Sequence, residues 1–286
     1  MQFVRYRHGS GSSQWGYKTD DTVYVLADVP GEESTLTAIA NPSYRQRVRR
    51  LAAAGELSTL EASAITILAP VGQPGKLIAL GLNYRDHAEE QDTDIPERPL
   101  LFGKAPTSVT HPDRPIVYPD AIDRLDYEVE LGIVIGRTAR RVDADEATEY
   151  VAGYTVLNDV SARDAQFEDK QWFRGKSYDT FAPMGPTLAT GPEFEPNDRV
   201  VRLRVNGETK QESNTDQLIF GPGDVIEYTS RVMTLQPGDV ISTGTPGGVG
   251  VFRDPPELLE PGDTVEAEIE GIGTLRNSVV DEPTLK

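Results

Sequence analysis

Two glutamates stand one residue apart in an apolar segment of this chain, which makes them candidates for holding a metal ion. Glu128 and Glu130 fall within Tyr127–Ile135. If that segment is a β-strand, alternate side chains share one face. Neighbouring carboxylates in apolar surroundings repel each other and lose hydration, and a bound cation relieves both costs. Such oxygen ligands favour Mg²⁺, Mn²⁺ or Ca²⁺ over Zn²⁺. The alternative is an edge strand with a solvated acidic face.

Asp159 is the candidate for a third carboxylate ligand. The apolar residues Val156 and Leu157 run into it, and a polar segment begins directly after it. We therefore expect Asp159 to lie where a strand ends and a helix starts. The competing role at such a position is that of a helix N-cap, for which Asp is among the preferred residues. Residue type alone favours the cap.

His87 and Glu90 have the spacing of a general-base pair. They are three residues apart in a short segment that reads as a helix, so both lie on one helical face. A carboxylate beside an imidazole raises its basicity and orients it. The other histidines, His8 and His111, lie in plain loop contexts. The alternative is an ordinary surface pair.

Lys176 lies in a segment rich in glycine and proline that we predict to be a loop, Gly175–Pro186. A lysine among carboxylates can neutralise a developing oxyanion or position a carboxylate substrate. The alternative is a surface lysine. That alternative is weaker than usual because the chain contains only seven lysines.

The glycine-rich segment Thr243–Gly250 is predicted to be a ligand-binding loop that follows a strand. Glycines permit close approach of the backbone, and the amides and the Thr245 hydroxyl could bind a carboxylate. The segment lacks the Gly-Lys-Ser/Thr of a P-loop and does not match the dinucleotide-binding fingerprint. A plain loop is the alternative.

The elements that position these residues divide into a short N-terminal unit and a longer remainder. In the unit we predict strands at Gln2–Tyr6 and Thr22–Ala27 and a helix from Ser43 to about Ala54. The Pro- and Gly-rich stretch 69–75 marks the boundary. We therefore predict a small N-terminal α+β domain at 1–72 and a catalytic domain at 73–286.

From Lys76 onward the pattern is mostly strands separated by turns. The predicted strands and the one hairpin are Leu77–Leu82, Tyr127–Ile135, Val151–Leu157, the hairpin Arg202–Gln211 with Asn206-Gly207 at its turn, Asp239–Thr243 and Thr264–Glu270. Pro222-Gly223-Asp224 is predicted to open a helix. Because long helical periods between the strands are absent, the sequence predicts a β-rich α+β fold, not a doubly wound sheet.

Composition narrows the partners and the compartment. The net charge is −18, and such a field disfavours nucleic acid and anionic membranes as partners. The chain has no cysteine, which excludes disulfides and thiolate metal sites. No apolar stretch is long enough for a membrane span, and the segment MQFVRYRHGS lacks the apolar core of a signal peptide. We expect a cytoplasmic protein whose acidic, lysine-poor surface is typical of adaptation to high salt.

The order of these segments resembles the fumarylacetoacetate hydrolase family. The resemblance covers about residues 70 to 280. The matching segments are Gly81–His87 with Glu90, Pro99–Lys104, Tyr127–Leu131, Asn158–Gln166, Gly175–Pro186 and Thr243–Gly250. The segment Phe167–Arg174 stays unassigned.

The resemblance implies a mixed β-sandwich roll and a homodimer, with Glu128, Glu130 and Asp159 as ligands of Mg²⁺ or Mn²⁺. It also implies that His87 and Glu90 activate water. Lys176 then acts in catalysis, and the implied substrate contacts are Lys104, Arg163, Gln166 and Thr245.

The reaction expected from this resemblance is hydrolysis of a C–C bond in a 2,4-dioxo acid, giving pyruvate and a carboxylic acid. The intact His87–Glu90 pair favours hydrolysis, because decarboxylation needs no water nucleophile. Other reactions of 2-oxo acids on the same scaffold stay open: oxaloacetate decarboxylation, dehydration of 2-keto-3-deoxy sugar acids, and isomerisation of 2-hydroxyhepta-2,4-diene-1,7-dioate. A non-catalytic protein with a structural Ca²⁺ is the alternative from a different class.

Overall fold

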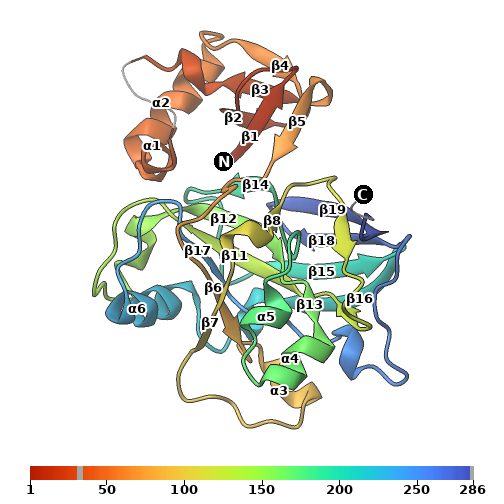
Figure 1. Cartoon of the computed structure of the whole chain (residues 1–286). Coiled ribbons are helices and arrows are strands. Elements are labelled where there is room, and N and C mark those ends of the chain that lie inside the picture. Colours follow the sequence, from red (N-terminus) through yellow and green to blue (C-terminus); the bar gives the residue numbers. More distant parts are fainter. Residues whose placement is uncertain (31–34, 284–286) are drawn as a thin grey trace.

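The computed structural model describes residues 1–30 and 35–283 and is dominated by β-strands (Figure 1). The strands in chain order are β1 (Gln2–His8), β2 (Gln14–Thr19), β3 (Thr22–Val25), β4 (Thr59–Glu61), β5 (Ile65–Leu68), β6 (Leu77–Gly81), β7 (Leu100–Lys104), β8 (Val109–Thr110), β9 (Ile116–Tyr118), β10 (Leu125–Asp126), β11 (Val129–Ile135), β12 (Val151–Asn158), β13 (Ser161–Ala162), β14 (Ala182–Ala189), β15 (Val200–Val205), β16 (Glu208–Asn214), β17 (Val240–Ser242), β18 (Thr264–Ile269) and β19 (Gly273–Asp281).

The helices are short and lie between the strands. They are α1 (Leu36–Ala40), α2 (Pro42–Ala53), α3 (Arg85–Glu90), α4 (Arg163–Asp169), α5 (Phe173–Lys176) and α6 (Pro222–Val232). The 3₁₀ turns are Leu26–Asp28, Ala62–Ala64, Pro106–Ser108, Ala147–Tyr150, Thr215–Gln217 and Gly250–Phe252. Among the described residues, no helix is both long and apolar enough to span a bilayer.

Two sheets form the body of the molecule. The larger sheet has the order β4-β3-β2-β1-β14-β12-β11-β17-β6-β7, with β5 beside β1 and β8 beside β14. The smaller sheet has the order β16-β15-β18-β19-β9. Most neighbours are antiparallel, whereas β17 and β6, β14 and β8, and β19 and β9 run parallel. These mixed sheets with few helices confirm the predicted β-rich α+β fold.

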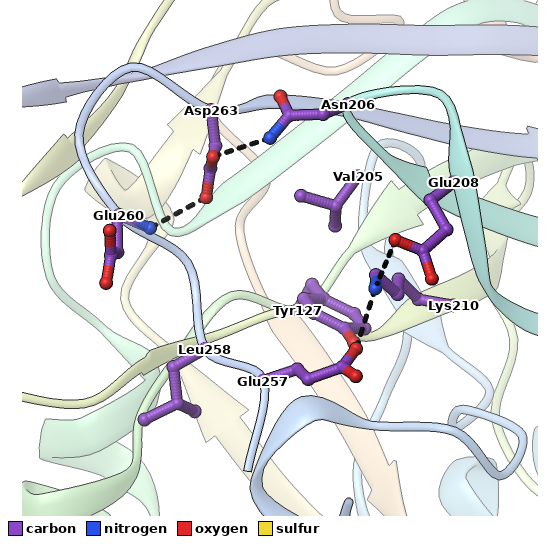
Figure 2. A pocket seen from close by; sticks show the side chains of 9 residues that line it. All are labelled: Tyr127, Val205, Asn206, Glu208, Lys210, Glu257, Leu258, Glu260 and Asp263. Carbon is purple, nitrogen blue, oxygen red and sulfur yellow. Dashed lines mark hydrogen bonds and ion pairs between the residues drawn. The ribbon is translucent and has the colours of Figure 1, made fainter. Parts of the chain in front are cut away.

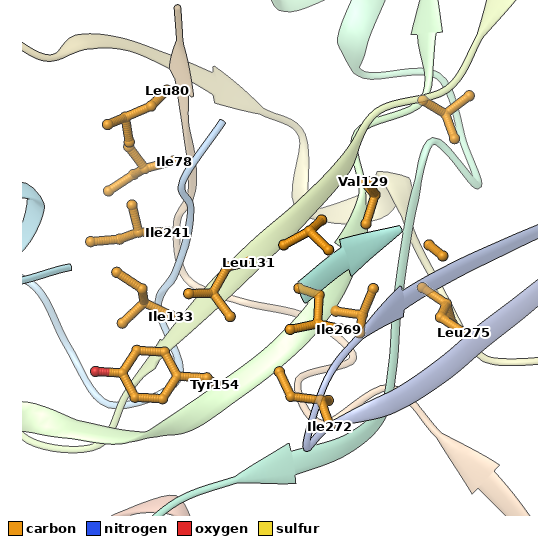
Figure 3. Close-up of a cluster of buried hydrophobic side chains, with 14 of the residues drawn as sticks. Ile78, Leu80, Val129, Leu131, Ile133, Tyr154, Ile241, Ile269, Ile272 and Leu275 are labelled. Atoms are coloured by element: carbon orange, nitrogen blue, oxygen red, sulfur yellow. The ribbon is translucent and has the colours of Figure 1, made fainter. Parts of the chain in front are cut away.

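The main core lies between the two sheets (Figure 3). Val129, Leu131 and Ile133 of β11 belong to one buried cluster with Ile269 of β18 and Leu275 of β19, and all are at most 1% exposed. Strand β11 lies between β12 and β17, so neither of its edges is free. All of its side chains are buried, so both of its faces are covered as well. The alternative of a solvated edge strand for Glu128 and Glu130 is therefore wrong.

The N-terminal unit, drawn red to orange, occupies one end of the molecule and joins the larger sheet through β1 (Figure 1). Gln2 pairs with Ala189 and Phe3 with Leu188 of β14. A second core cluster contains residues of the unit, such as Phe3 and Ile39, together with Val134 from the centre of the sheet. The unit thus packs closely on the remainder, and the division at residue 72 stays a prediction.

Most predicted elements are found with small shifts at their ends. The Asn206-Gly207 hairpin is confirmed, and α6 begins at Pro222 as expected. The strand predicted from Tyr127 begins at Val129, so Glu128 lies just before it. Lys176, predicted in a loop, is instead the last residue of α5. The described strands missed from the sequence include β14 and β19.

Candidate metal and active site

Three carboxylates meet at the end of β11 and β12. The antiparallel register places Val129 opposite Asn158, so the residues on either side of that pair are brought together. Oxygen atoms of Glu128, Glu130 and Asp159 all lie within 4.8 Å of one another. The three residues are buried, with at most 7% of their surface exposed. This acidic triad can therefore bind a divalent metal ion.

Asp159 does not cap a helix. Helix α4 begins at Arg163 and its N-cap residue is Ala162, so the N-cap alternative for Asp159 is wrong. The Asp159 carboxylate instead accepts hydrogen bonds from the ammonium groups of Lys104 and Lys176, the latter at 2.8 Å. Val160 and the two residues of β13 separate Asp159 from the helix.

Glu130 carries the strongest sign that a cation belongs in the triad. Its Oε2 accepts hydrogen bonds from Ser242 Oγ at 2.5 Å and from the Gly244 amide at 2.9 Å. Its Oε1 is buried and has no hydrogen-bond partner among the described residues. Burial, and then the negative charges of Asp159 and Glu128, raise the pKa of Glu130 well above its usual range. A divalent cation would bind the free oxygen and offset the repulsion, so these residues fit a metal site.

Two lysines approach the triad from different elements. Lys176 Nζ lies 2.8 Å from both Glu128 and Asp159. Burial lowers the pKa of its ammonium, but the two carboxylates outweigh burial and raise it. At Lys104, which contacts only Asp159 among the triad, burial dominates and the pKa is lowered. Burial would also raise the pKa of Glu128, but Lys176 and Arg163 lower it to about 2.

Arg163 links the triad to a fourth buried acid, Asp126, which sequence analysis did not single out. Its Nε lies 2.8 Å from Asp126 and its Nη2 2.7 Å from Glu128, while Nη1 donates to Gln166 at 2.9 Å. Asp126 also accepts backbone hydrogen bonds from Gly250 at 2.8 Å and Val251 at 3.0 Å. The residues next to Asp126 in the sequence do not indicate its role, because its partners Arg163, Gly250 and Val251 come from distant segments.

Removing the Asp126 carboxylate should destabilise the fold severely. Asp126→Ala leaves Arg163 buried next to Glu128 with one carboxylate fewer and two backbone amides unpaired. We expect the free energy of unfolding to fall by about 3–5 kcal/mol. Asp126→Asn, which keeps the shape and one acceptor, should cost less. Urea denaturation of both variants tests this, and equal losses would contradict the role of the charge.

The predicted pair of His87 and Glu90 is formed on α3. His87 Nδ1 lies 2.9 Å from Glu90 Oε2; His87 is only 7% exposed, whereas Glu90 is exposed. The other oxygen of Glu90 accepts a hydrogen bond from the Gly248 amide at 2.8 Å. Burial raises the pKa of Glu90, but the contacts with His87 and Gly248 outweigh it and lower the pKa. An ionised Glu90 can orient the imidazole and stabilise its protonated form.

The glycine-rich loop binds carboxylates, but they belong to this chain. Its backbone amides donate to four acids: Gly244 to Glu130, Gly247 to Asp86, Gly248 to Glu90, and Gly250 to Asp126. The prediction that these amides bind a substrate carboxylate therefore needs correction, because the amides are already used. Gly248 has φ +96° and a Cβ there would lie 2.3 Å from the Lys210 carbonyl oxygen, so a side chain is excluded.

A cavity of about 130 Å³ opens beside the triad. Its polar wall contains His87, Gln91, Glu128, Arg163, Gln166, Lys176 and Thr245. Its apolar wall includes Leu82, Phe102, Phe167, Trp172 and Phe252. The previously unassigned segment Phe167–Arg174 thus contributes two aromatic side chains. Thr245 Oγ1 lines the cavity and donates to the Val129 carbonyl at 3.0 Å.

Lys104 is the predicted substrate contact that does not line this cavity. It is 3% exposed and lies against Asp159 and the Val160 carbonyl. The other three predicted contacts, Arg163, Gln166 and Thr245, are on the cavity wall. The structure therefore brings six of the predicted site residues to one cavity wall, and Lys104 lies behind it against the acidic triad.

A second hollow, of about 260 Å³, borders Tyr127, the residue before Glu128 (Figure 2). The charged groups drawn there are largely satisfied by one another. Lys210 Nζ lies 2.9 Å from Glu208 and 2.7 Å from Glu257, and Asp263 accepts from Asn206 at 2.7 Å. Because this second hollow has no converging buried acids among its lining residues, we place the candidate active site in the smaller cavity.

Glu130 should make the stability of the metal-free protein fall as the pH rises. Its pKa is raised by folding, so the folded state holds the extra proton above pH 4.5, and stability is lost as the pH rises through that window. Glu128 affects stability in a different pH range. Because its pKa is lowered to about 2, its contribution to stability is complete above pH 4.5 and is lost as the pH falls toward 2.

We expect the free energy of unfolding, measured in EDTA, to fall less for Glu130→Gln than for the unmodified protein when the pH is raised from about 5 to about 8. The reason is that the glutamine amide cannot ionise. Urea denaturation midpoints across this range measure the difference. Parallel curves for the two proteins would contradict the assignment.

Comparison with known proteins places these residues in context. Residues 76–280 match the family described as "Fumarylacetoacetate (FAA) hydrolase C-terminal". The mitochondrial oxaloacetate tautomerase of Rattus norvegicus is 45% identical over 235 residues, which cover 82% of this chain and 75% of that protein. An uncharacterised protein of Methanocaldococcus jannaschii is 49% identical over 210 residues, covering 73% and 85%.

Solved structures are similar over nearly the whole chain. A fumarylacetoacetate hydrolase from Exiguobacterium antarcticum has a TM-score of 0.86 and 38% identity, covering 99% of this chain and all of that one. A 2-hydroxyhepta-2,4-diene-1,7-dioate isomerase from Mycobacterium marinum has a TM-score of 0.79 and 33% identity, again covering 99% of this chain and 100% of that one.

Proposed function

Because this chain belongs to the fumarylacetoacetate hydrolase family, we propose that it is a divalent-metal-dependent enzyme that interconverts the enol and keto forms of oxaloacetate or a close analogue. The similarity to oxaloacetate tautomerases supports this reaction over the hydrolysis expected first from the sequence. A 2-hydroxyhepta-2,4-diene-1,7-dioate isomerase is also among the similar structures. Both belong to the isomerase alternative that the sequence left open.

The observation that carries the proposal is the convergence of three kinds of group on one cavity. Glu128 belongs to the acidic triad, Arg163 and Lys176 are buried cations, and His87 is a histidine oriented by a carboxylate. A small dianionic 2-oxo acid needs a metal ligand set, cationic groups for its carboxylates and a group that exchanges protons. The cavity is small, which suits a compact substrate.

The residues would hold Mg²⁺ or Mn²⁺ through Glu128, Glu130 and Asp159, since a carboxylate-only set favours hard cations. A bound ion would act as a Lewis acid that stabilises negative charge on the 2-oxo oxygen. Ca²⁺ is the other hard ion that this ligand set could accept.

The protein side chains then manage the substrate and its proton. Ketonisation removes the proton from the enol oxygen at C2 and delivers one to C3, while the C2–C3 double bond becomes single and C2–O becomes a carbonyl. His87, oriented by Glu90, accepts the proton from the enol oxygen and then delivers it to C3, so the imidazole ends in its starting state. Lys176 and Arg163 balance the negative charge of the enolate and the carboxylates. Gln166 and Thr245 contact the substrate from the same wall.

Hydrolysis of a 2,4-dioxo acid is the second candidate, and the His87–Glu90 pair is the observation that favours it. In that reaction His87 takes a proton from water, whose oxygen adds to the 4-carbonyl carbon, and the C3–C4 bond breaks. The products are pyruvate and a carboxylic acid. A purely structural Ca²⁺ protein is disfavoured because it would not require a buried histidine, paired with a glutamate, on the same cavity.

The assembly and the compartment belong to the proposal as well. We expect a homodimer, which light scattering tests. Cytoplasmic location is expected from the sequence, although the oxaloacetate tautomerases it resembles are described as mitochondrial. An acidic surface adapted to salt predicts higher thermal stability in molar salt than in dilute buffer.

The deciding experiment follows the ultraviolet absorbance of the enol of oxaloacetate in the presence of the purified protein. With Mg²⁺ or Mn²⁺ we expect the enol to disappear much faster than without protein, and EDTA should abolish the acceleration. Pyruvate release is measured in parallel from oxaloacetate and from acetylpyruvate. Fast pyruvate release from acetylpyruvate, with no effect on the enol of oxaloacetate, would establish hydrolysis and overturn tautomerisation.

A further inference from the structure

Gln91 occupies the face of His87 that a substrate or a water would have to use. It is the residue directly after α3, and its side-chain Nε2 lies 2.7 Å from His87 Nε2. The opposite ring nitrogen, Nδ1, lies 2.9 Å from Glu90. Both hydrogen-bonding sites of the imidazole are thus filled by the protein itself, although His87 lines the cavity.

The chemistry of these partners defines the state of the ring. An ionised Glu90 carboxylate can only accept, so Nδ1 carries a hydrogen and donates it. The amide nitrogen of Gln91 can only donate, so Nε2 is the acceptor. Nε2 is therefore the basic nitrogen of a neutral imidazole, and Gln91 occupies its lone pair. His87 can take a proton only after Gln91 turns away.

Gln91 also lines the cavity, where its amide can find another acceptor. A charged acceptor forms a stronger hydrogen bond than a neutral imidazole. If the 2-oxo acid end of a substrate lies at the triad, its other end faces the remaining wall. The polar groups of that wall include His87 and Gln91, and aromatic residues such as Phe102 and Trp172 surround them.

We propose that Gln91 caps His87 in the free enzyme and is drawn off by a second carboxylate on the substrate, which makes Gln91 a specificity-determining residue for dicarboxylic 2-oxo acids. This inference rests on the proposed function for its substrate, whereas the cap itself is independent of any reaction. A substrate with a methyl tail has no anionic group to compete for the amide, and His87 stays capped more of the time.

The first test measures the cap without any substrate. Diethyl pyrocarbonate acylates the free imidazole nitrogen, so the modification rate of His87 reports how often Nε2 is uncovered. We expect Gln91→Met, which keeps the length but has no amide, to raise that rate about fivefold, the factor for loss of one ordinary hydrogen bond. Mass spectrometry separates His87 from the exposed His8, which is the internal standard.

Glu89→Gln is the matched control, since Glu89 is exposed on the same helix. It should leave the modification rate of His87 unchanged. If Gln91→Met modifies His87 no faster than the control, the cap does not exist and the proposal fails.

The second test compares substrates with and without the second carboxylate. The preference of the enzyme for the enol of oxaloacetate over that of acetylpyruvate, as a ratio of kcat/KM, should fall at least about tenfold in Gln91→Met, since a hydrogen bond to a charged group is lost for one substrate only. An unchanged ratio would overturn the specificity role even if the cap is real. Should the unmodified protein act on neither enol, the proposed function fails, while the modification rate still decides the cap.

Discussion

Glu128→Gln should lose its metal ion and its activity together. Glu128 is one of three carboxylates whose oxygens converge within 4.8 Å, and glutamine keeps its shape but removes the charge. Replacing even an indirect neighbour of a metal typically weakens binding about 10–100-fold, so loss of a direct ligand should exceed about 100-fold. Isothermal titration with Mn²⁺ measures the affinity, and turnover on oxaloacetate should fall below detection.

The control for this variant is Glu212→Gln, which makes the same change at an exposed ion pair with Arg202. Exposed pairs of this kind contribute about 0–1 kcal/mol, so its metal affinity and fold should be unaffected. Lys176 and Arg163 lose a charged partner in Glu128→Gln, which could destabilise the fold. Circular dichroism is therefore used to test that this variant is folded. A folded Glu128→Gln that binds Mn²⁺ normally would remove this residue from the ligand set.

His87→Ala should separate metal binding from catalysis. His87 lines the cavity, but its hydrogen-bond partners are Glu90 and Gln91 and not the acidic triad, so the metal affinity should stay within about twofold of the unmodified protein. The rate of the proton transfer should fall about 10²–10⁴-fold, the usual contribution of a general acid or base. Stopped-flow measurement of enol disappearance gives the rate, and titration with Mn²⁺ gives the affinity.

Two further variants sharpen the result for His87. His8→Ala removes an exposed histidine and should change neither quantity. Glu90→Gln keeps the imidazole but weakens its orientation, so its loss of rate should be smaller than that of His87→Ala. Undiminished turnover in His87→Ala would exclude His87 from both tautomerisation and hydrolysis.

The sequence anticipated the site better where neighbours in the chain are also neighbours in space. Glu128 and Glu130 are two positions apart in extended backbone at the start of β11, and His87 and Glu90 are one helical turn apart, so local periodicity was enough to pair them. Asp159 was ambiguous because its partners come from other strands and helices. Only the register of β11 against β12 decides that it is a third acid of the triad and not a helix cap.

The residues that sequence analysis missed act through long-range contacts. Asp126 precedes the acidic strand, yet its role depends on Arg163 and on amides more than 100 positions away, at Gly250 and Val251. Gln91 resembles any polar residue after a helix, and its contact with His87 depends on a side-chain rotamer. The glycine-rich loop was recognised as carboxylate-binding, but no pattern could tell that the carboxylates would be those of the protein itself.

The glycine-rich loop Thr243–Gly250 contacts one part of the candidate active site and not the other, so the two parts can change independently. This short peptide donates hydrogen bonds to Glu130 of the acidic triad, to Glu90 beside His87 and to Asp126 beside Arg163, so a change of its backbone would misalign all three at once. The aromatic wall, with Phe102, Phe167 and Trp172, receives none of these hydrogen bonds. An engineer who wants a new substrate should therefore randomise the wall and leave the loop untouched. The same separation would let descendants of one ancestral enzyme diverge in substrate while their proton-transfer machinery stays in place.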